Sequence, residues 1–252
     1  MQTGTKRKEG GFAETVRVVF HALIIALVIR TFLFQPFNIP SGSMIPTLLV
    51  GDYLFVSKFS YGYTHYSFPF SPPIFSGRIL SSQPQRGDVV VFRLPKDDSV
   101  DYIKRVIGLP GDRIQMRAGR LWINGTMLKV RPDGSGLVES ENGDKATAPR
   151  FIETLPTGRE HPIFKIDTVG SLDDTRVFVV PPGHVFMMGD NRDNSLDSRV
   201  PAIEGGVGFV PLENLIGRAE VVLGSWDLPM AKLPVTQWAQ GLRVSRFFSR
   251  IH

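Results

Sequence analysis

The clearest feature of the hydrophobic pattern is a long apolar run near the N-terminus. It extends over 19 residues, from Val16 to Phe34, and is interrupted by Arg17, His21 and Arg30. As an α-helix this run would be about 28 Å long, close to the hydrocarbon thickness of a bilayer. The two arginines lie near its ends, where long side chains reach the headgroups. The pattern therefore predicts a transmembrane helix over residues 16–34.

The flanks of this run bear on its orientation. Basic residues 6–8 precede it and favour a cytoplasmic location for residues 1–15, with the chain beyond about residue 36 on the far side. One alternative is a cleavable signal peptide with its apolar core at residues 22–29. The small residues 41–43 lie more than ten positions beyond that core, which favours an uncleaved anchor. A buried helix of a soluble protein is the other alternative, and the basic flank disfavours it.

After residue 35 helical periodicity is scarce, and the pattern becomes that of short strands separated by turns. The chain contains 25 Gly and 19 Pro, which suits β structure with many turns. Runs rich in β-branched or alternating apolar residues predict strands, which lie within residues 48–59, 88–94, 102–109, 151–180, 185–188 and 207–226. The chain is therefore predicted to be mainly β.

Three segments between these strands differ from them. Residues 61–84 are rich in aromatic residues, Ser and Pro, and predict an extended loop or ribbon. Residues 113–130 predict a hairpin whose tight turn is Asn124-Gly125. Residues 131–150 are polar and Gly-rich, so we expect a mobile loop there.

The C-terminal segment, residues 231–252, has a different composition. It mixes apolar with basic side chains, namely Trp238, Leu242, Phe247, Phe248 and Ile251 with Arg243, Arg246 and Arg250. As a helix it would be basic and moderately amphipathic, so it could lie on an anionic membrane surface. A terminal helix packed on the domain, or a frayed tail, explains the same residues, and both interpretations stay open.

The composition excludes several kinds of catalytic and binding chemistry. The chain has no cysteine, which excludes disulfides, thiolate metal sites and a cysteine nucleophile. Its net charge of +5 comes from basic residues that are spread out except at the two ends, so we expect no nucleic-acid partner.

Most motifs of hydrolytic enzymes are missing from the sequence. A peptidase needs an activated nucleophile, a proton acceptor and a site for the oxyanion. The sequence contains no HExxH zinc motif, no GxSxG elbow and no serine followed three residues later by lysine. The five histidines are scattered, and nothing around them suggests a triad.

Two segments hold candidate catalytic residues. In residues 40–48, prolines bracket a small-residue turn that could expose one serine hydroxyl and aim a second at an oxyanion. Taken alone, this segment is better explained as an ordinary loop. In residues 101–112, Lys104 lies among Ile103, Val106 and Ile107, and an inward-pointing lysine there would become a usable base. Taken alone, an outward-facing strand lysine is again the simpler explanation.

A third segment, residues 189–199, combines turn-forming residues with alternating charges. It could form an Asx turn or a calcium loop. The calcium spacing is poor, because the glycine and the terminal glutamate of such a loop are misplaced.

Together these segments resemble the bacterial type I signal peptidases, a serine–lysine dyad family. The resemblance lies in residues 41–52, 86–92, 101–112 and 189–199, in that order, after an N-terminal anchor. Four long motifs in the same order make the resemblance specific, although they cover only about a fifth of the chain directly.

The resemblance implies an organisation. We expect an antiparallel β catalytic domain formed by residues 36–112 and 183–230, and a second β domain, residues 113–182, inserted into it. One N-terminal transmembrane helix precedes them.

The resemblance also implies catalytic roles. Ser43 would be the nucleophile and Lys104 the general base. Ser41 would donate a side-chain hydrogen bond to the oxyanion beside the backbone N–H of Ser43, and Ser195 would hydrogen-bond and orient Lys104.

Supporting and substrate-binding residues follow from the same motifs. Asp197 and Arg199 would form an ion pair. The residues expected to line small apolar pockets for the substrate are Ile39, Met44, Leu48, Val91, Tyr102 and Ile103.

The implied function is that of a membrane-bound serine endopeptidase that cleaves N-terminal signal peptides from exported preproteins through an acyl-enzyme. Its substrates would carry small residues at the first and third positions before the cut. No metal or cofactor is implied, because the lysine replaces both His and Asp of a triad. We expect a single-pass protein of the bacterial inner membrane, with the lipid bilayer as a partner and the catalytic domain on the periplasmic or outer face.

One local departure from the family is visible. The tryptophan-glycine that usually follows the last motif is replaced by Val200-Pro201 and a Gly-rich stretch, residues 205–208. In addition, only one span is evident, whereas some members of the family have two. The departure concerns the geometry after Arg199 and not the catalytic residues.

Two other functions fit parts of the sequence. A self-cleaving serine–lysine repressor-type protein would share the core fold, but it would carry a DNA-binding domain in place of the anchor. A membrane-tethered β binding module would explain the anchor and the strands, but not why Ser43, Lys104 and Ser195 lie in these motifs. A cleavage assay that compares the unchanged chain with Ser43→Ala separates these functions.

Overall fold

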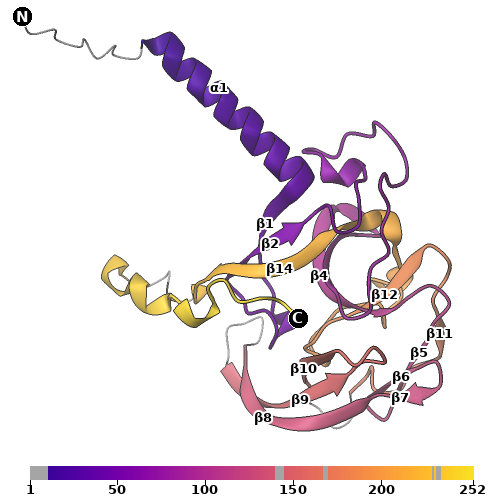
Figure 1. Ribbon diagram of the computed structural model, residues 1–252. Coiled ribbons are helices and arrows are strands. Elements are labelled where there is room, and N and C mark those ends of the chain that lie inside the picture. The colour runs from indigo at the N-terminus through magenta and orange to yellow at the C-terminus, as the bar shows by residue number, and fades with distance from the viewer. Residues whose placement is uncertain (1–10, 140–144, 167–169, 229, 231–233) are drawn as a thin grey trace, which may run out of the picture.

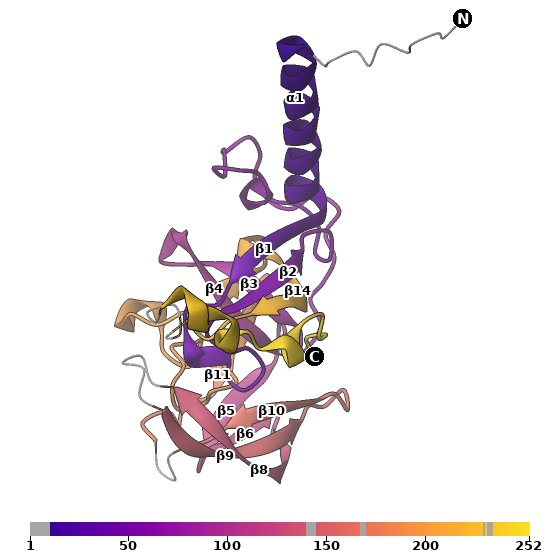
Figure 2. The ribbon, with the colours of Figure 1, turned by 90° about the vertical axis from the view of Figure 1, so that its left-hand side faces the viewer.

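The computed structural model describes residues 11–139, 145–166, 170–228, 230 and 234–252. A single long helix extends away from a β-rich body, as both views of the whole chain show (Figures 1 and 2). Basic residues 6–8, on which the predicted orientation depends, lie outside the described residues.

The long helix is continuous and almost wholly exposed. Helix α1 covers Phe12–Val28, and a π-helical turn over Ile29–Leu33 continues it. Together they form a helix of 22 residues that is long and apolar enough to cross a membrane. Only 6% of its most apolar stretch is buried. The helix begins four residues before the predicted Val16, and Phe34, predicted to be its last residue, already belongs to the first strand.

A seven-stranded sheet forms the body next to this helix. Its order is β1-β2-β14-β3-β4-β12-β13, and every pairing is antiparallel. The strands are β1 (Phe34–Asn38), β2 (Asp52–Ser57), β3 (Val89–Leu94), β4 (Asp97–Gly108), β12 (His184–Met188), β13 (Val210–Pro211) and β14 (Leu215–Ser225). The strand predicted within residues 48–59 is β2, and a turn in which the N–H of Asp52 donates to the carbonyl of Leu49 precedes it.

Two smaller antiparallel sheets lie at the end of the body away from α1 (Figure 1). One has the order β11-β5-β6-β7 and the other the order β10-β9-β8. Their strands are β5 (Arg113–Arg117), β6 (Arg120–Ile123), β7 (Thr126–Met127), β8 (Lys129–Glu139), β9 (Lys145–Thr154), β10 (Glu160–Phe164) and β11 (Phe178–Val179). The predicted turn Asn124-Gly125 joins β6 to β7, and both of its residues have positive φ, 53° and 81°. The antiparallel, mainly β fold is confirmed.

The mobile loop expected over residues 131–150 is wrong for the described part of that range. Strands β8 and β9 pair along their length, with Val130 opposite Glu153 and Val138 opposite Ala146. Asp133 and Gly134 lie in a bulge of β8, since the register shifts between Pro132 and Ser135. Residues 140–144 of the expected loop lie outside the described residues.

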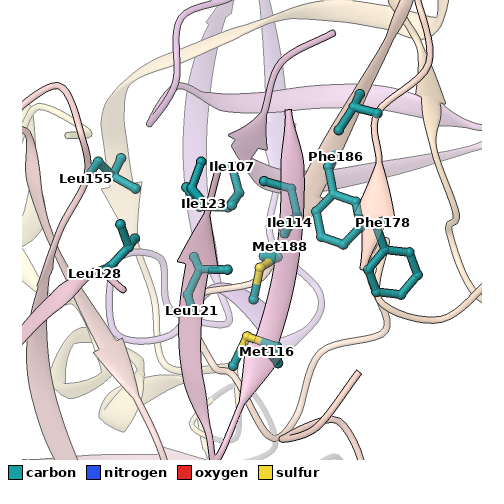
Figure 3. Packing of buried hydrophobic residues seen from close by; sticks show 11 residues of the cluster. Ile107, Ile114, Met116, Leu121, Ile123, Leu128, Leu155, Phe178, Phe186 and Met188 are labelled. Carbon is teal, nitrogen blue, oxygen red and sulfur yellow. The ribbon is translucent and has the colours of Figure 1, made fainter. Parts of the chain in front are cut away.

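Separate apolar clusters hold the sheets together. One packs β5 and β6 against β4 and β12 through Ile107, Ile114 and Phe186 (Figure 3). Another lies against the turn after β1, with Met44 and Leu48 among its members. A third joins Ile45 to Val138 and Phe164, so that the β8–β10 sheet supports the chain next to Ser43.

The C-terminal segment forms no α-helix within the described residues. It consists of 3-10 turns at Val235–Gly241 and Val244–Arg246, followed by an extended tail. The tail hydrogen-bonds to β14, with the N–H of Phe248 donating to the carbonyl of Val222 at 2.7 Å. Of the interpretations left open, the structure shows a segment packed on the body.

Candidate active site

The turn that carries Ser43 is held from two sides. Ser43 lies in a 3-10 turn, Gly42–Met44, and the Met44 side chain is buried in the cluster behind it. Across the turn, the N–H of Asn191 donates to the carbonyl of Ser43, and its side-chain amide donates to the carbonyl of Gly42, both at 3.1 Å. The backbone around the serine is therefore fixed by the core and by the 189–199 segment.

Lys104 meets this turn from β4. Its Nζ lies 2.6 Å from Ser43 Oγ and 3.1 Å from the carbonyl oxygen of Ile103. The side chain is only 3% exposed, and its Nζ lies 5.3 Å from the centre of the Tyr102 ring. The lysine therefore points inward, and the outward-facing strand lysine is excluded.

The surroundings of Lys104 favour its neutral form. Burial lowers the pKa of Lys104 to about 8, and the charge of Arg199 acts in the same direction. The carboxylates of Asp197 and Asp190 oppose this shift. Because burial is the largest effect, the lysine becomes a stronger candidate base than an ordinary surface lysine.

Buried ion pairs of the 189–199 segment lie close behind the lysine. Asp197 and Arg199 form a two-pronged pair with both distances at 2.8 Å, as the resemblance implied. Asp190 forms a similar pair with Arg105, at 2.8 and 2.7 Å, and accepts a hydrogen bond from Thr47 at 2.5 Å. These pairs tie the segment to β4 and to the loop after Ser43.

Ser195 does not make the expected hydrogen bond to Lys104. Its Oγ is buried and has no hydrogen-bond partner among the described residues. It lies beside Gly189, where a Cβ would come within 2.2 Å of Ser195 Oγ and 2.5 Å of the Ser43 carbonyl oxygen. A residue larger than glycine at position 189 would therefore displace the serine turn.

A groove of 760 Å³ runs past Ser43 and Lys104. It lies between residues 37–43 on one side and residues 100–104 on the other, and Asn194 and Leu196 add to its wall. The predicted residues that line it are Ser41, Ile39, Val91, Tyr102 and Ile103.

Met44 and Leu48 are not among the residues that line the groove. Both are fully buried in the apolar cluster that also contains Ile39 and Val91. The 3-10 turn directs Met44 into the core while the Ser43 side chain meets Lys104. In this structure neither side chain reaches the groove, and the expectation that they line the substrate pockets stays a prediction.

A calcium site in residues 189–199 does not fit the charges present. Asp190 and Asp197 are paired with arginines, and Asp193 accepts from Lys165 at 2.6 Å. Within the part of the chain that the structure describes, no group of three or more His, Asp or Glu side chains could hold a metal ion.

Sequence reasoning missed several supporting residues. Asn191 holds the serine turn, and Arg192 forms a two-pronged pair with Glu153 of β9, at 2.9 and 2.5 Å. His161 lies 3.6 Å from Glu153, makes no hydrogen bond to another described residue, and has a pKa that burial lowers to about 3. Only the position of Asn191 and Arg192 inside a recognised motif could have drawn attention to them.

Comparison with known proteins places these features in a family. A family profile described as "Signal peptidase, peptidase S26" matches residues 12–226. Signal peptidase I of Rickettsia typhi (strain ATCC VR-144 / Wilmington) is 43% identical over 247 residues, which cover 91% of this chain and 90% of that protein. Signal peptidase I of Rickettsia conorii (strain ATCC VR-613 / Malish 7) is 41% identical over 264 residues, which cover 98% and 93%.

A solved structure is also similar in sequence. The crystal structure of a signal peptidase I from Enterococcus faecalis V583 has 26% sequence identity, covers 54% of this chain and 97% of its own, and has a TM-score of 0.31. The profile match and the two relatives show that the chain belongs to the signal peptidase I family of serine peptidases.

Proposed function

We propose that the chain is a membrane-bound serine endopeptidase that removes N-terminal signal peptides from exported preproteins, with Ser43 as nucleophile and Lys104 as general base. The observation that carries this proposal is the 2.6 Å separation of Lys104 Nζ and Ser43 Oγ in the groove. With a pKa of about 8, a substantial fraction of Lys104 is neutral near pH 8, whereas well under about 1% of an ordinary lysine would be.

The proposed reaction has two halves. Ser43 Oγ bonds to the scissile carbonyl carbon, and its proton moves to Lys104 Nζ. The ammonium returns that proton to the leaving amine nitrogen as the C–N bond breaks, which leaves an ester on the serine. Water then attacks the ester carbonyl carbon while Lys104 Nζ takes its proton. The ammonium returns that proton to Ser43 Oγ as the C–O bond of the ester breaks, and the peptide leaves with a new carboxyl group.

Other residues have proposed supporting roles. The hydroxyl of Ser41 lines the groove and, with the N–H of Ser43, would stabilise the oxyanion. Ser195 is proposed to orient Lys104 through a hydrogen bond. This conformation does not make that bond, and the proposal is supported by the buried Ser195 Oγ, which has no hydrogen-bond partner among the described residues. The pair of Asp197 and Arg199 would hold the segment that carries Ser195.

The groove suits an extended peptide. Strand β1 lies at the edge of the sheet, and β12 pairs with β4 only from Arg105 to Gly108, so residues 100–104 also have a free edge. Free edges on both sides of a groove can bind a peptide as an added strand. Apolar Ile39, Val91 and Ile103 would favour small residues at the first and third positions before the cut.

We place the active site beside a membrane. The exposed apolar helix Phe12–Leu33 would cross the bacterial inner membrane with residues 1–15 in the cytoplasm. The body would then lie on the periplasmic or outer face. We also propose residues 36–112 and 183–230 as the catalytic domain and residues 113–182 as an inserted one, supported by the separate sheets that these segments form. Residues 231–252 would be a C-terminal appendage of the catalytic domain.

The test is cleavage of a purified preprotein by the full chain in detergent. Ser43→Ala should abolish cleavage, whereas Ser225→Ala, which changes another buried serine outside the groove, should not. Preproteins with alanine at the first and third positions should be cut faster than those with Phe or Glu there. Cleavage by Ser43→Ala at the unchanged rate would refute the dyad, and indifference to the two positions would refute the specificity.

A further inference from the structure

The end of strand β10 pairs with the segment that holds the serine turn. The N–H of Phe164, the last residue of β10, donates to the carbonyl of Asp190 at 2.9 Å. The N–H of Arg192 donates to the carbonyl of Phe164 at 3.0 Å. These two bonds form a parallel bridge between Phe164 and Asn191. The β8–β10 sheet therefore reaches the 189–199 segment through its backbone, a contact that the proposed reaction does not explain.

A buried ion pair fastens the same contact. Glu153 of β9 accepts two hydrogen bonds from the Arg192 guanidinium, at 2.9 and 2.5 Å, and both side chains are fully buried. Burial acts to raise the pKa of Glu153, but the charge and hydrogen bonds of Arg192 outweigh it and hold the pKa below its ordinary value. The carboxylate is therefore charged, and it ties β9 to the residue that follows Asn191.

An apolar contact supports the serine turn from the same sheet. The Phe164 side chain packs with Ile45, which follows Ser43 by two residues, and with Val138 of β8. A Cβ at Gly136 would come within 2.7 Å of the Phe164 ring, so the glycine permits the close approach of β8. The β8–β10 sheet thus contacts both the chain after Ser43 and the segment across from it.

Asn191 links this sheet to the peptide unit before Ser43. It is fully buried, and its side-chain amide donates to the carbonyl of Gly42 at 3.1 Å. A peptide unit is planar, so a contact that fixes the Gly42 carbonyl also fixes the direction of the Ser43 N–H in the same unit. This N–H is the backbone donor proposed for the oxyanion, and Asn191 therefore sets its direction.

We propose that Glu153 is a positioning residue for the oxyanion donor: it holds Arg192, and through it Asn191, in the place from which Asn191 orients the Ser43 N–H. The inference rests on the proposed roles of Ser43 and Lys104. The oxyanion exists only after Ser43 has attacked, so a displaced donor lowers kcat and leaves substrate binding unchanged. Glu153 does not line the groove, and it acts on the reaction only through the residues that it holds.

The first test separates kcat from KM for a short soluble signal-peptide substrate, with the full chain in detergent. Glu153→Gln should lower kcat by about tenfold or more and keep KM within about twofold of the unchanged value. Glu160→Gln is the matched control, since Glu160 lies in neighbouring β10 but is exposed and pairs with Arg131 at 3.1 Å. It should change neither constant. An unchanged kcat in Glu153→Gln, or a rise in KM as large as the fall in kcat, would overturn the proposal.

The pH profile of Glu153→Gln distinguishes positioning from a charge effect. Apart from burial, the groups that act on the pKa of Lys104 are Asp197, Asp190 and Arg199. The plateau of kcat should therefore fall while its inflection stays near that of the unchanged chain. A shift of the inflection that accounts for the lost activity would overturn the positioning role.

A charge-free double variant separates positioning from folding. Glu153→Gln leaves the Arg192 guanidinium unpaired, whereas Glu153→Met/Arg192→Met removes both charges and keeps apolar volume, which should largely preserve stability. Rates are expressed per folded molecule, with the folded fraction taken from urea unfolding. The double variant should show the same fall in kcat, because Asn191 has lost the pair that holds it. A double variant with the full kcat would overturn the proposal.

A double-mutant cycle tests the route through Asn191. In an Asn191→Ala background, Glu153→Gln should change kcat by less than about twofold, because the hydrogen bond through which it acts is already lost. Equal falls in both backgrounds would overturn this route. Cleavage by the unchanged chain with a full kcat in Glu153→Gln would overturn only this inference, whereas cleavage by Ser43→Ala at the unchanged rate would overturn the proposed function and this inference with it.

Discussion

Two lysines of this chain are buried to the same degree, yet only one faces a group on which a base can act. Lys104 is 3% exposed and Lys58 is 2% exposed. Burial lowers the pKa of each to about 8. Nζ of Lys104 lies 2.6 Å from a serine hydroxyl in the groove, whereas Nζ of Lys58 lies 2.6 Å from the carbonyl oxygen of Ser67.

The comparison shows that a lowered pKa does not by itself identify a catalytic lysine. A hydroxyl has a proton to give, whereas a carbonyl oxygen can only accept. Lys58 therefore keeps an N–H directed at Ser67, and this hydrogen bond holds the chain around Ser67 against the end of β2. A perturbed pKa marks candidates, and the neighbouring atom decides between catalysis and structure.

Replacement of each lysine by methionine tests this distinction with the largest expected effect. Lys104→Met should reduce kcat/KM for a soluble signal-peptide substrate by about 10²–10⁴-fold, because the proton acceptor is lost. Lys58→Met should leave kcat/KM close to that of the unchanged chain. Both are measured with the full chain in detergent.

Lys104→Arg is a further control, and it should also be inactive because a guanidinium stays protonated. Substantial activity in this variant would remove Lys104 from the mechanism. A loss in Lys58→Met as large as that in Lys104→Met would show that burial, and not the adjacent serine, decides the effect.

The carboxylates near the two lysines should differ in their contribution to stability. Asp197→Asn leaves the buried guanidinium of Arg199 without its partner and should lower the free energy of unfolding by about 3–5 kcal/mol. Asp101→Asn breaks a partly exposed pair with Arg93, at 3.2 Å, and should cost less than about 1 kcal/mol. Urea unfolding of both variants provides the measurement, and equal losses would contradict the difference in burial on which the comparison depends.

Much of this organisation could be predicted from the sequence because it depends on local patterns. The apolar run predicts the start of the helix to within four residues, and β3 lies inside the predicted strand 88–94. Asn124-Gly125 marks its turn because these residues tolerate positive φ. The family and the mainly β fold, both inferred from ordered motifs and turns, are confirmed.

Other features depend on partners far away in the chain, and no local pattern encodes them. Residues 131–139 are polar and Gly-rich, yet they form β8 because β9 pairs with them. Whether Met44 or Ser43 points into the groove is decided by a single 3-10 turn, which hydrophobicity does not reveal. Lys58 is buried where the chain after β2 turns back and the carbonyl of Ser67, nine residues later, accepts its hydrogen bond. The catalytic roles of Ser43, Lys104 and Ser195 stay predictions that the experiments above address.

The pH dependence of cleavage should follow the pKa of Lys104. Only the neutral amine accepts the serine proton, so kcat/KM should rise about tenfold per pH unit below pH 8 and level off above it. At pH 6 the rate should be about 100-fold below the plateau. Rates from pH 5.5 to 9.5 with a substrate that does not titrate in this range provide the measurement, and Lys58→Met should give the same inflection. An inflection near pH 10 would mean that Lys104 has an ordinary pKa.

The same pKa has a consequence for stability that both lysines should share. The folded pKa, about 8, lies below the unfolded value, so the unfolded chain binds the proton more tightly. Each lysine therefore destabilises the fold fully below about pH 8, and the penalty fades as pH rises towards about 10.4. The stability of Lys104→Met relative to the unchanged chain should be greater at pH 7 than at pH 10 by about 2–3 kcal/mol, and Lys58→Met should show the same trend. A pH-independent difference for Lys104→Met would show that its pKa is not lowered in the folded chain. A shared trend in stability, together with opposite outcomes in activity, would show that the serine next to Lys104 makes the difference.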